Sequence, residues 1–214
     1  MTLSRLILLR HGQTEHNATN RMQGQTDTVL SAVGRAQAAE IAPVIAAMKP
    51  DVVISSDLAR AADTAAAVVA LTGHELRTDA RLRETHLGRW QDRTHIEVDR
   101  DYPGARIRWR GDARWAPPGG ESRVEVGARA RAVVEELAAA HTGGEPVTAL
   151  LVAHGGLIAA LTASLLDLPV DHWPVIGRIG NTCWAELERG RDTEVPPWRL
   201  ERWNVCRQEP SDVE

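Results

Sequence analysis

The sequence predicts an α/β protein: a three-layer α/β/α sandwich with a mostly parallel central sheet. Three short apolar runs lack polar alternation, as is typical of strands that are buried on both faces. They span residues 5–10, 51–56 and 147–154. Helical patterns lie between and after these runs, at residues 31–48, 57–71, 122–140 and 155–166. Strands that alternate with helices predict a parallel sheet with helices on both faces.

Two of these helices carry clear local signals. In residues 57–71, apolar side chains recur every three or four positions from Leu58 to Val69, which places them on one stripe of a helix. Ser122 is followed three residues later by Glu125, the spacing of a capping box. We therefore expect a helix to begin just after Ser122.

Two further features affect the outline of the fold. Pro43 stands inside the helix expected over residues 31–48, and we expect it to kink or split that helix because proline has no N–H for an internal hydrogen bond. Residues 183–189 and 198–204 alternate enough to predict a pair of edge strands.

Length and charge limit the architecture and the partners. A chain of 214 residues with 43% hydrophobic residues is long enough for one well-buried domain. We expect a single domain over residues 1–214, with a short cap inserted at about residues 85–120. A formal charge of -4 and a pI near 6.1 argue against nucleic acid or an anionic membrane as a partner. Any anion must therefore be recognised locally.

The remaining composition favours the cytoplasm. Cys183 and Cys206 are too few for a disulfide scaffold, and the N-terminal apolar run at residues 6–9 is shorter than the apolar core of a signal peptide. No stretch approaches the roughly 20 apolar residues needed to span a bilayer. We expect a soluble cytoplasmic protein.

Charged and polar side chains stand where three of the predicted strands end. Arg10 and His11 end the first strand, His154 ends a late one, and Arg60 lies in the first turn of the helix after the second. The carboxyl ends of parallel strands meet at one edge of a sheet, and helix N-termini point their N–H groups there. We therefore expect a compact anion site that suits a phosphoryl group.

Each of these residues alone has an ordinary structural explanation. A histidine at a strand end is more often a satisfied polar residue than a catalyst, and a lone Arg60 would be a solvated helix residue. The combination is more informative, because Arg-His-Gly, Ser-Ser-Asp with a following arginine, and His-Gly-Gly occur in this order. We interpret the other six histidines as ordinary polar residues without a catalytic role.

The sequence resembles the histidine phosphatase superfamily, also called phosphoglycerate mutase-like. The resemblance covers nearly the whole chain and rests on six motifs. They are LLRHGQTEHN, MQGQTDTVLSAVGRAQA, ISSDLARAADTA, LRETHLGRWQ, PPGGES and LVAHGGLIAAL. RMQGQTDT, RLRETHLG, WAPPGGESR and VAHGGLIAAL are most similar to members of the phosphatase branch whose substrate is a glucosylated phosphoglycerate.

The resemblance implies a role for each site residue. His11 would be the nucleophile and Glu84 the proton donor. Arg10, Arg60 and His154 would form the phosphate pocket, which Asn17, Gln23 and Gly24 would also line. Gly12 and Gly155 lack the Cβ that would obstruct approach of the backbone to the phosphate. The resemblance also implies a small-molecule phosphomonoester as substrate and a homodimer as the assembly.

The residue types suit phosphoryl transfer. A neutral imidazole nitrogen of His11 can attack phosphorus in line and form a phosphohistidine that water hydrolyses. The planar forks of Arg10 and Arg60 match the equatorial oxygens of the transition state. Glu84 would need to carry a proton for the leaving alkoxide, and a phosphate dianion beside it would favour this.

A metal centre is the less favoured interpretation of the same residues. His11, His154 and Glu84 match a His₂Glu zinc set in composition. No HExxH or comparable ligand pair is present in the sequence, and two adjacent arginines would repel a divalent cation. We expect neither a metal nor another cofactor.

The motifs do not decide between several functions and substrates. A broad-specificity acid phosphatase, a cofactor-dependent phosphoglycerate mutase and a non-catalytic binding protein share these motifs. The segment from Glu84 to Glu121 is shorter than the insertion typical of the mutases, which favours a phosphatase.

An Arg- and Trp-rich stretch, RIRWRGDARW, is a candidate for recognition of the alcohol. Nucleic-acid stacking is disfavoured by the overall negative charge, and packing of a tryptophan-anchored flap is the ordinary explanation. We hypothesise that one of its tryptophans stacks on a sugar and that one of its arginines pairs with a glycerate carboxylate. The candidates are Trp109, Trp115, Arg106, Arg108, Arg110 and Arg114.

Overall fold

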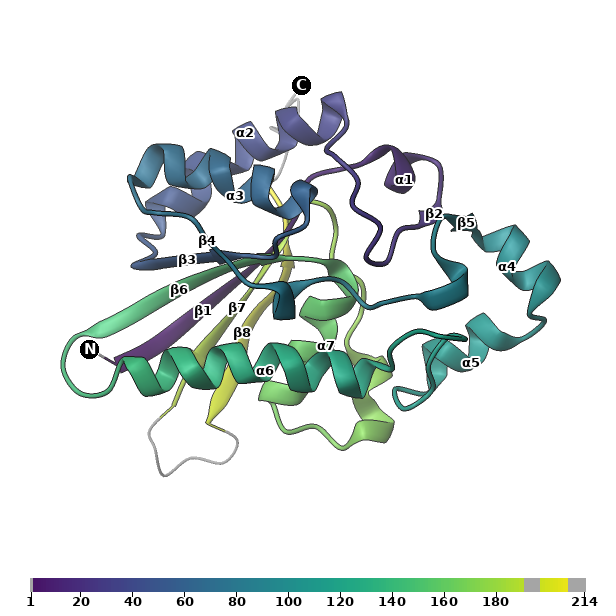
Figure 1. Cartoon of the computed structure of the whole chain (residues 1–214). Coiled ribbons are helices and arrows are strands. Elements are labelled where there is room, and N and C mark those ends of the chain that lie inside the picture. The colour runs from purple at the N-terminus through teal and green to yellow at the C-terminus, as the bar shows by residue number, and fades with distance from the viewer. Residues whose placement is uncertain (1, 191–196, 208–214) are drawn as a thin grey trace, which may run out of the picture.

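A six-stranded sheet with strand order β4-β3-β6-β1-β7-β8 forms the centre of the computed structural model, which describes residues 2–190 and 197–207 (Figure 1). The strands are β1 (Thr2–Arg10), β3 (Val52–Ser55), β4 (Arg77–Thr78), β6 (Pro146–Ala153), β7 (Trp184–Arg189) and β8 (Trp198–Val205). Strands β4, β3, β6 and β1 are parallel, and β7 and β8 add antiparallel pairings. The three predicted central strands and the predicted edge pair are confirmed.

Two helices cover each face of this sheet (Figure 1). They are α2 (Ala32–Ala47) and α3 (Ala59–Thr72) on one face, and α6 (Arg123–Ala140) and α7 (Gly155–Leu165) on the other. Strand β1 shows how the layers arise, because Leu6 and Leu8 join the core under α6 and α7 whereas Ile7 and Leu9 join the core under α2 and α3. The predicted three-layer sandwich is confirmed.

The helix boundaries test two local predictions. Helix α6 begins after Ser122, whose hydroxyl accepts from the backbone N–H of Glu125 while the Glu125 carboxylate accepts from the Ser122 N–H, so the predicted capping box is confirmed. The prediction that Pro43 splits the first long helix is wrong, because α2 continues through it. Pro43 is exposed, as is Ala39 one turn earlier, so the carbonyl that loses its helical partner faces water.

Residues 85–120, which we call the cap segment, pack around tryptophan side chains. The segment contains η2 (Gly88–Trp90), β5 (Arg93–Thr94), α4 (His95–Asp101) and α5 (Ala105–Gly111), and β5 pairs with β2 (Arg21–Met22). Trp90 is fully buried and contacts the rings of Tyr102, Trp109 and Trp115, at centroid distances of 5.5 to 6.2 Å. The cap segment therefore has a small core of its own. The remaining short helices are α1 (Glu15–Ala18), η1 (Ala80–Leu82) and η3 (Val170–Val175).

The two cysteines are joined. Cys183, just before β7, and Cys206, just after β8, form a disulfide. This single link does not amount to a disulfide scaffold, but it removes the cysteines as support for a reducing compartment. Among the helices of the described chain, none combines the length and apolar character that crossing a membrane requires.

Candidate active site

The predicted site residues meet at the carboxyl ends of the parallel strands. Strands β1 and β6 are neighbours, so Arg10, His11 and His154 end side by side. Arg60 lies in the first turn of α3, which follows β3, and Glu84 follows η1. Arg10, His11, Arg60 and Glu84 line a pocket of about 800 Å³.

His11 presents one ring nitrogen as a base. Its side chain is 3% exposed, and Nδ1 lies 2.6 Å from the carbonyl oxygen of Gly12, so Nδ1 carries the proton and Nε2 keeps its lone pair. Burial lowers the pKa of His11 well below 6.5, and the positive charges of Arg10 and Arg60 lower it further. A neutral imidazole with a free Nε2 has the form that a nucleophile needs.

His154 lies behind His11, and the ring centroids are 5.1 Å apart. It is fully buried, and burial lowers its pKa well below 6.5, with Arg60 and His11 adding to the effect. Within the described chain neither of its ring nitrogens has a hydrogen-bond partner. A buried neutral imidazole with an uncompensated N–H is suited to donate to an oxygen of a bound phosphoryl group.

Two arginines surround these histidines and are themselves held by backbone carbonyls. Arg60 is fully buried and donates from Nη1 to Thr26 and from Nη2 to Gly24, each at 2.8 Å. Arg10 donates from Nη1 to the carbonyl of Ile179 at 2.7 Å. Burial lowers the pKa of Arg60 to about 10, so it stays protonated at neutral pH.

The Nε atoms of Arg10 and Arg60 are buried and lack a partner in the described residues. Buried donors of a charged group are costly to leave unpaired. The pocket is therefore arranged for an anion with several acceptor oxygens, as the sequence predicts.

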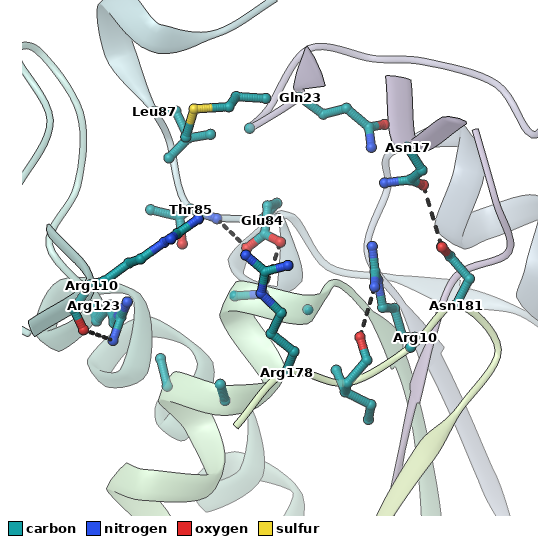
Figure 2. Close-up of a pocket in the computed structure, with 18 of the residues that line it drawn as sticks. Arg10, Asn17, Gln23, Glu84, Thr85, Leu87, Arg110, Arg123, Arg178 and Asn181 are labelled. Atoms are coloured by element: carbon teal, nitrogen blue, oxygen red, sulfur yellow. Dashed lines mark hydrogen bonds between the residues drawn. The ribbon is translucent and has the colours of Figure 1, made fainter. Parts of the chain in front are cut away.

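Asn17 and Gln23 also line the pocket (Figure 2), and so does Gly24. Gln23 uses its amide oxygen to accept from the hydroxyls of Thr14 and Thr28 at 2.9 and 2.6 Å, which leaves its amide nitrogen for the pocket. Asn17 likewise uses its oxygen in the capping box at the start of α1. Both side chains therefore present donors.

Glu84 is bound at the N-terminus of α7 (Figure 2). Its Oε2 accepts from the N–H of Gly156 at 2.9 Å, and its Oε1 accepts from the N–H groups of Leu157 and Thr85 at 3.0 and 2.7 Å. These three bonds fix the carboxyl group at the pocket wall. A Cβ on Gly156 would lie 2.5 Å from Oε1, so glycine is required there.

Gly12 and Gly155, the two other glycines predicted to lie at the phosphate, have different surroundings. The N–H of Gly12 donates to the Thr64 hydroxyl, and a Cβ on Gly12 would lie 2.5 Å from the carbonyl oxygen of Gly34, so this residue serves the packing of β1 against α2. Gly155 lines the pocket, but a Cβ there would make only ordinary contacts with Arg10 from 3.5 Å. The second glycine of the His-Gly-Gly motif is the constrained one.

The structure adds site residues that the sequence did not reveal. Asn181 donates from Nδ2 to the carbonyl of His11 at 2.9 Å and lies 3.3 Å from the side-chain oxygen of Asn17. Arg123 and Arg178 also line the pocket. Arg123 is the first residue of α6, where the sequence pattern indicates a helix cap and not a binding residue, and no local pattern marks Asn181 or Arg178.

Only part of the Arg- and Trp-rich stretch reaches the pocket. Arg110 and Trp109 line it. Arg106 pairs instead with Asp99, Arg114 pairs with Asp171, and the guanidinium of Arg108 lies 5.9 Å from the ring centroid of Trp115. One face of Trp109 is taken by Arg123, at 5.4 Å from the ring centroid. Of the residues in this stretch, only Arg110 and Trp109 therefore remain candidates for recognition of the alcohol.

Residues 2–190 and 197–207 contain no group of three or more His, Cys, Asp or Glu side chains arranged to hold a metal ion. His11, His154 and Glu84, the zinc set considered from the sequence, stand with Arg10 and Arg60, whose charges oppose a divalent cation.

The whole arrangement is that of a histidine phosphatase. The family model of the histidine phosphatase superfamily (branch 1) matches residues 6–205. The chain belongs to the histidine phosphatase superfamily, as its motifs predict.

Within this superfamily the chain is similar to two named phosphatases. It is 52% identical to the glucosyl-3-phosphoglycerate phosphatase of Mycolicibacterium vanbaalenii and 53% identical to that of Mycobacterium tuberculosis, in both cases over the full length of both chains. A solved structure of mycobacterial glucosyl-3-phosphoglycerate phosphatase with VO₃ matches with a TM-score of 0.91 and 53% identity, covering 95% of this chain and 100% of that one. The probable phosphoglycerate mutase GpmB of Serratia proteamaculans is 36% identical, over 94% of this chain and 90% of its own.

The buried histidines predict an acid-sensitive stability. The unfolded chain takes up protons on His11 and His154 as the pH falls through about 6.5, whereas burial keeps both neutral in the folded state. Below about pH 6.5, each of the two histidines therefore lowers the free energy of unfolding by at most about 1.4 kcal/mol for every pH unit. Urea unfolding in phosphate-free buffer should show this loss between about pH 7.5 and about pH 5.5, a window above the titration of the carboxylates.

The variant His154→Asn is the control, because it removes one of the two titrating groups. Its loss of stability over the same pH window should be smaller than that of the wild-type chain by about 1.4 kcal/mol. Equal losses in the two proteins would show that His154 is already protonated in the folded state or does not titrate in this range.

Proposed function

We propose that the chain is a phosphomonoesterase that dephosphorylates glucosyl-3-phosphoglycerate through a phosphohistidine on His11. The observation that carries the reaction type is the neutral, buried His11 with a free Nε2, next to the unpaired Nε donors of Arg10 and Arg60. The substrate is supported by full-length relatives at 52% and 53% identity that carry that name.

In the first step, Nε2 of His11 attacks phosphorus and the bond between phosphorus and the ester oxygen breaks. Arg10, Arg60 and His154 donate to the equatorial oxygens, which carry the developing charge. Glu84, held at the N-terminus of α7, gives a proton to the leaving alkoxide, so the sugar-bearing alcohol departs neutral.

In the second step, water attacks the phosphohistidine. Glu84 takes a proton from the water, the bond between nitrogen and phosphorus breaks, and inorganic phosphate leaves with His11 restored. The net reaction is ester plus water to alcohol plus phosphate, and it needs no cofactor. Gln23 and Asn17 add donors at the rim of the phosphate site.

We further propose that the chain works in the cytoplasm as one domain, with the cap segment over the pocket and without a nucleic-acid partner. The overall charge of -4 supports the last point.

We also propose a homodimer that pairs across the open edge of the sheet. Strand β8 lies at the end of the strand order, and within the described chain its outer side has no strand partner. Light scattering after gel filtration should give twice the chain mass of 23.4 kDa. A monomer at every concentration tested would contradict the proposal.

Substrate preference is the direct test. Phosphate release should be measured with a chelator present, from glucosyl-3-phosphoglycerate, mannosyl-3-phosphoglycerate, 3-phosphoglycerate, phosphoserine and p-nitrophenyl phosphate. The proposal expects kcat/KM for the glucosylated compound to exceed the others by about tenfold or more. His11→Ala should abolish release, whereas His74→Ala, beyond the end of α3, should leave it unchanged.

The alternatives give different results in the same panel. Similar rates on all five compounds would indicate a broad-specificity phosphatase. Interconversion of 3- and 2-phosphoglycerate, stimulated by 2,3-bisphosphoglycerate, would indicate a mutase, and absence of all turnover would indicate a binding protein.

The role of Glu84 depends on the leaving group. An alkoxide needs a proton as it departs, whereas p-nitrophenolate leaves readily without one. Glu84→Gln should therefore lower kcat/KM for glucosyl-3-phosphoglycerate by about 100-fold or more, and that for p-nitrophenyl phosphate by less than about tenfold. Equal losses on both substrates would assign Glu84 to binding rather than to proton transfer.

A further inference from the structure

A second group of cations lines the pocket beside the phosphate site. It consists of Arg110 on α5, Arg123 at the start of α6 and Arg178 in the segment after η3, and we call it the arginine triad. Figure 2 shows Arg110 and Arg178 extending into the cavity from different sides, near Glu84. Two consecutive helices and a segment more than 50 residues later thus bring guanidinium groups to the same pocket.

Within the described residues, no carboxylate forms an ion pair with an arginine of the triad. Arg106 and Arg114 of the same cap segment form ion pairs with Asp99 and Asp171. Arg110 and Arg178, in contrast, make no ion pair with any residue in the described ranges, 2–190 and 197–207. The triad therefore concentrates positive charge that a bound anion would compensate.

The charges of the triad act on one another. Burial lowers the pKa of Arg110, and the charges of Arg106 and Arg178 lower it further. Burial and the neighbouring Arg110 lower the pKa of Arg123, and the negative charge of Glu84 offsets part of this effect. The only carboxylate lining this pocket in the described chain is Glu84, and its oxygens already accept three backbone N–H groups.

Position and shape limit the chemistry of the anion. Arg178 lies close enough to the phosphate site for its charge to lower the pKa of Arg10, although burial is the main cause. Because Arg10 and Arg178 line the same pocket, a ligand that contacts both sites would carry a second negative charge besides its phosphate. The planar fork of arginine matches a carboxylate in two parallel hydrogen bonds. Arg123 is in turn held against the ring of Trp109 and donates to the carbonyl of Arg110 at 3.3 Å.

We propose that Arg110 and Arg178, supported by Arg123, form a carboxylate site that selects phosphate esters of hydroxy acids over phosphate esters of uncharged alcohols. The inference deepens the proposed function, because it assigns recognition of the glycerate carboxylate to these side chains. The glucosyl group contributes to neither contact.

A matched pair of small esters tests the site. 3-Phosphoglycerate and glycerol 3-phosphate have the same skeleton and differ only in a carboxylate or a hydroxymethyl group. Wild-type enzyme should prefer 3-phosphoglycerate in kcat/KM by about tenfold or more, as expected for a charge-assisted pair. Arg110→Met and Arg178→Met should each remove most of this preference through KM, and should change kcat/KM for glycerol 3-phosphate by less than about threefold.

Two further variants sharpen the comparison. Arg114→Met removes a charge from the same cap segment and should leave the preference unchanged. Arg110→Lys keeps the positive charge but loses the planar guanidinium group, so it should retain only part of the preference for 3-phosphoglycerate. Unchanged preference in Arg110→Met and Arg178→Met, or equal losses on both esters, would overturn the carboxylate site while leaving the phosphatase standing.

Binding measurements on an inactive variant test the carboxylate site independently of the proposed phosphatase activity. Calorimetry on His11→Ala should show tighter binding of 3-phosphoglycerate than of glycerol 3-phosphate, and Arg178→Met in that background should abolish the difference. This result supports the site even if the wild-type chain hydrolyses neither ester. Equal affinities in His11→Ala would overturn it, whatever the activity.

Discussion

The buried guanidinium groups of Arg10 and Arg60 are the constraint on which the site depends. A buried positive charge must be hydrogen-bonded, and these two are held by the carbonyls of Gly24, Thr26 and Ile179. Those bonds fix the loop after β2 and the segment before β7 around the pocket. The same two charges, together with burial, keep His11 neutral. One set of interactions thus orders the loops and adds to the effect of burial that keeps His11, the proposed nucleophile, neutral.

The groups proposed to act on the phosphate are positioned by the ends of regular elements. His11 and His154 end neighbouring strands, Arg60 begins α3, and Glu84 is bound by the first N–H groups of α7. Side chains at such positions have little freedom to move, because the hydrogen bonds of a sheet or a helix fix the backbone that carries them. Preorganised donors lose no energy to rearrangement as charge develops in the transition state.

The sequence predicts those features of the fold and site that have a local cause. Buried strands appear as apolar runs, and Arg10, His11 and His154 stand where such runs end. Arg178 and Asn181 have no local signal, because the residues near them in the pocket, such as Arg110 and His11, are distant in the sequence. The packing role of Gly12 depends on Gly34 across the layer, which periodicity does not show.

The two groups of arginines, Arg10 with Arg60 and the arginine triad, lie on different parts of the fold. Arg10 and Arg60 are anchored to the central sheet and its loops, whereas Arg110 belongs to the cap segment, which packs around Trp90 as a separate small core. A change in the cap segment can therefore alter recognition of the alcohol without moving His11. A net charge of -4 is compatible with a strongly cationic pocket, because arginines elsewhere in the described chain, such as Arg81, Arg83 and Arg131, are paired with acids. On these proposals, the strand-end motifs carry the reaction, and the cap segment and the residues around Arg178 recognise the alcohol.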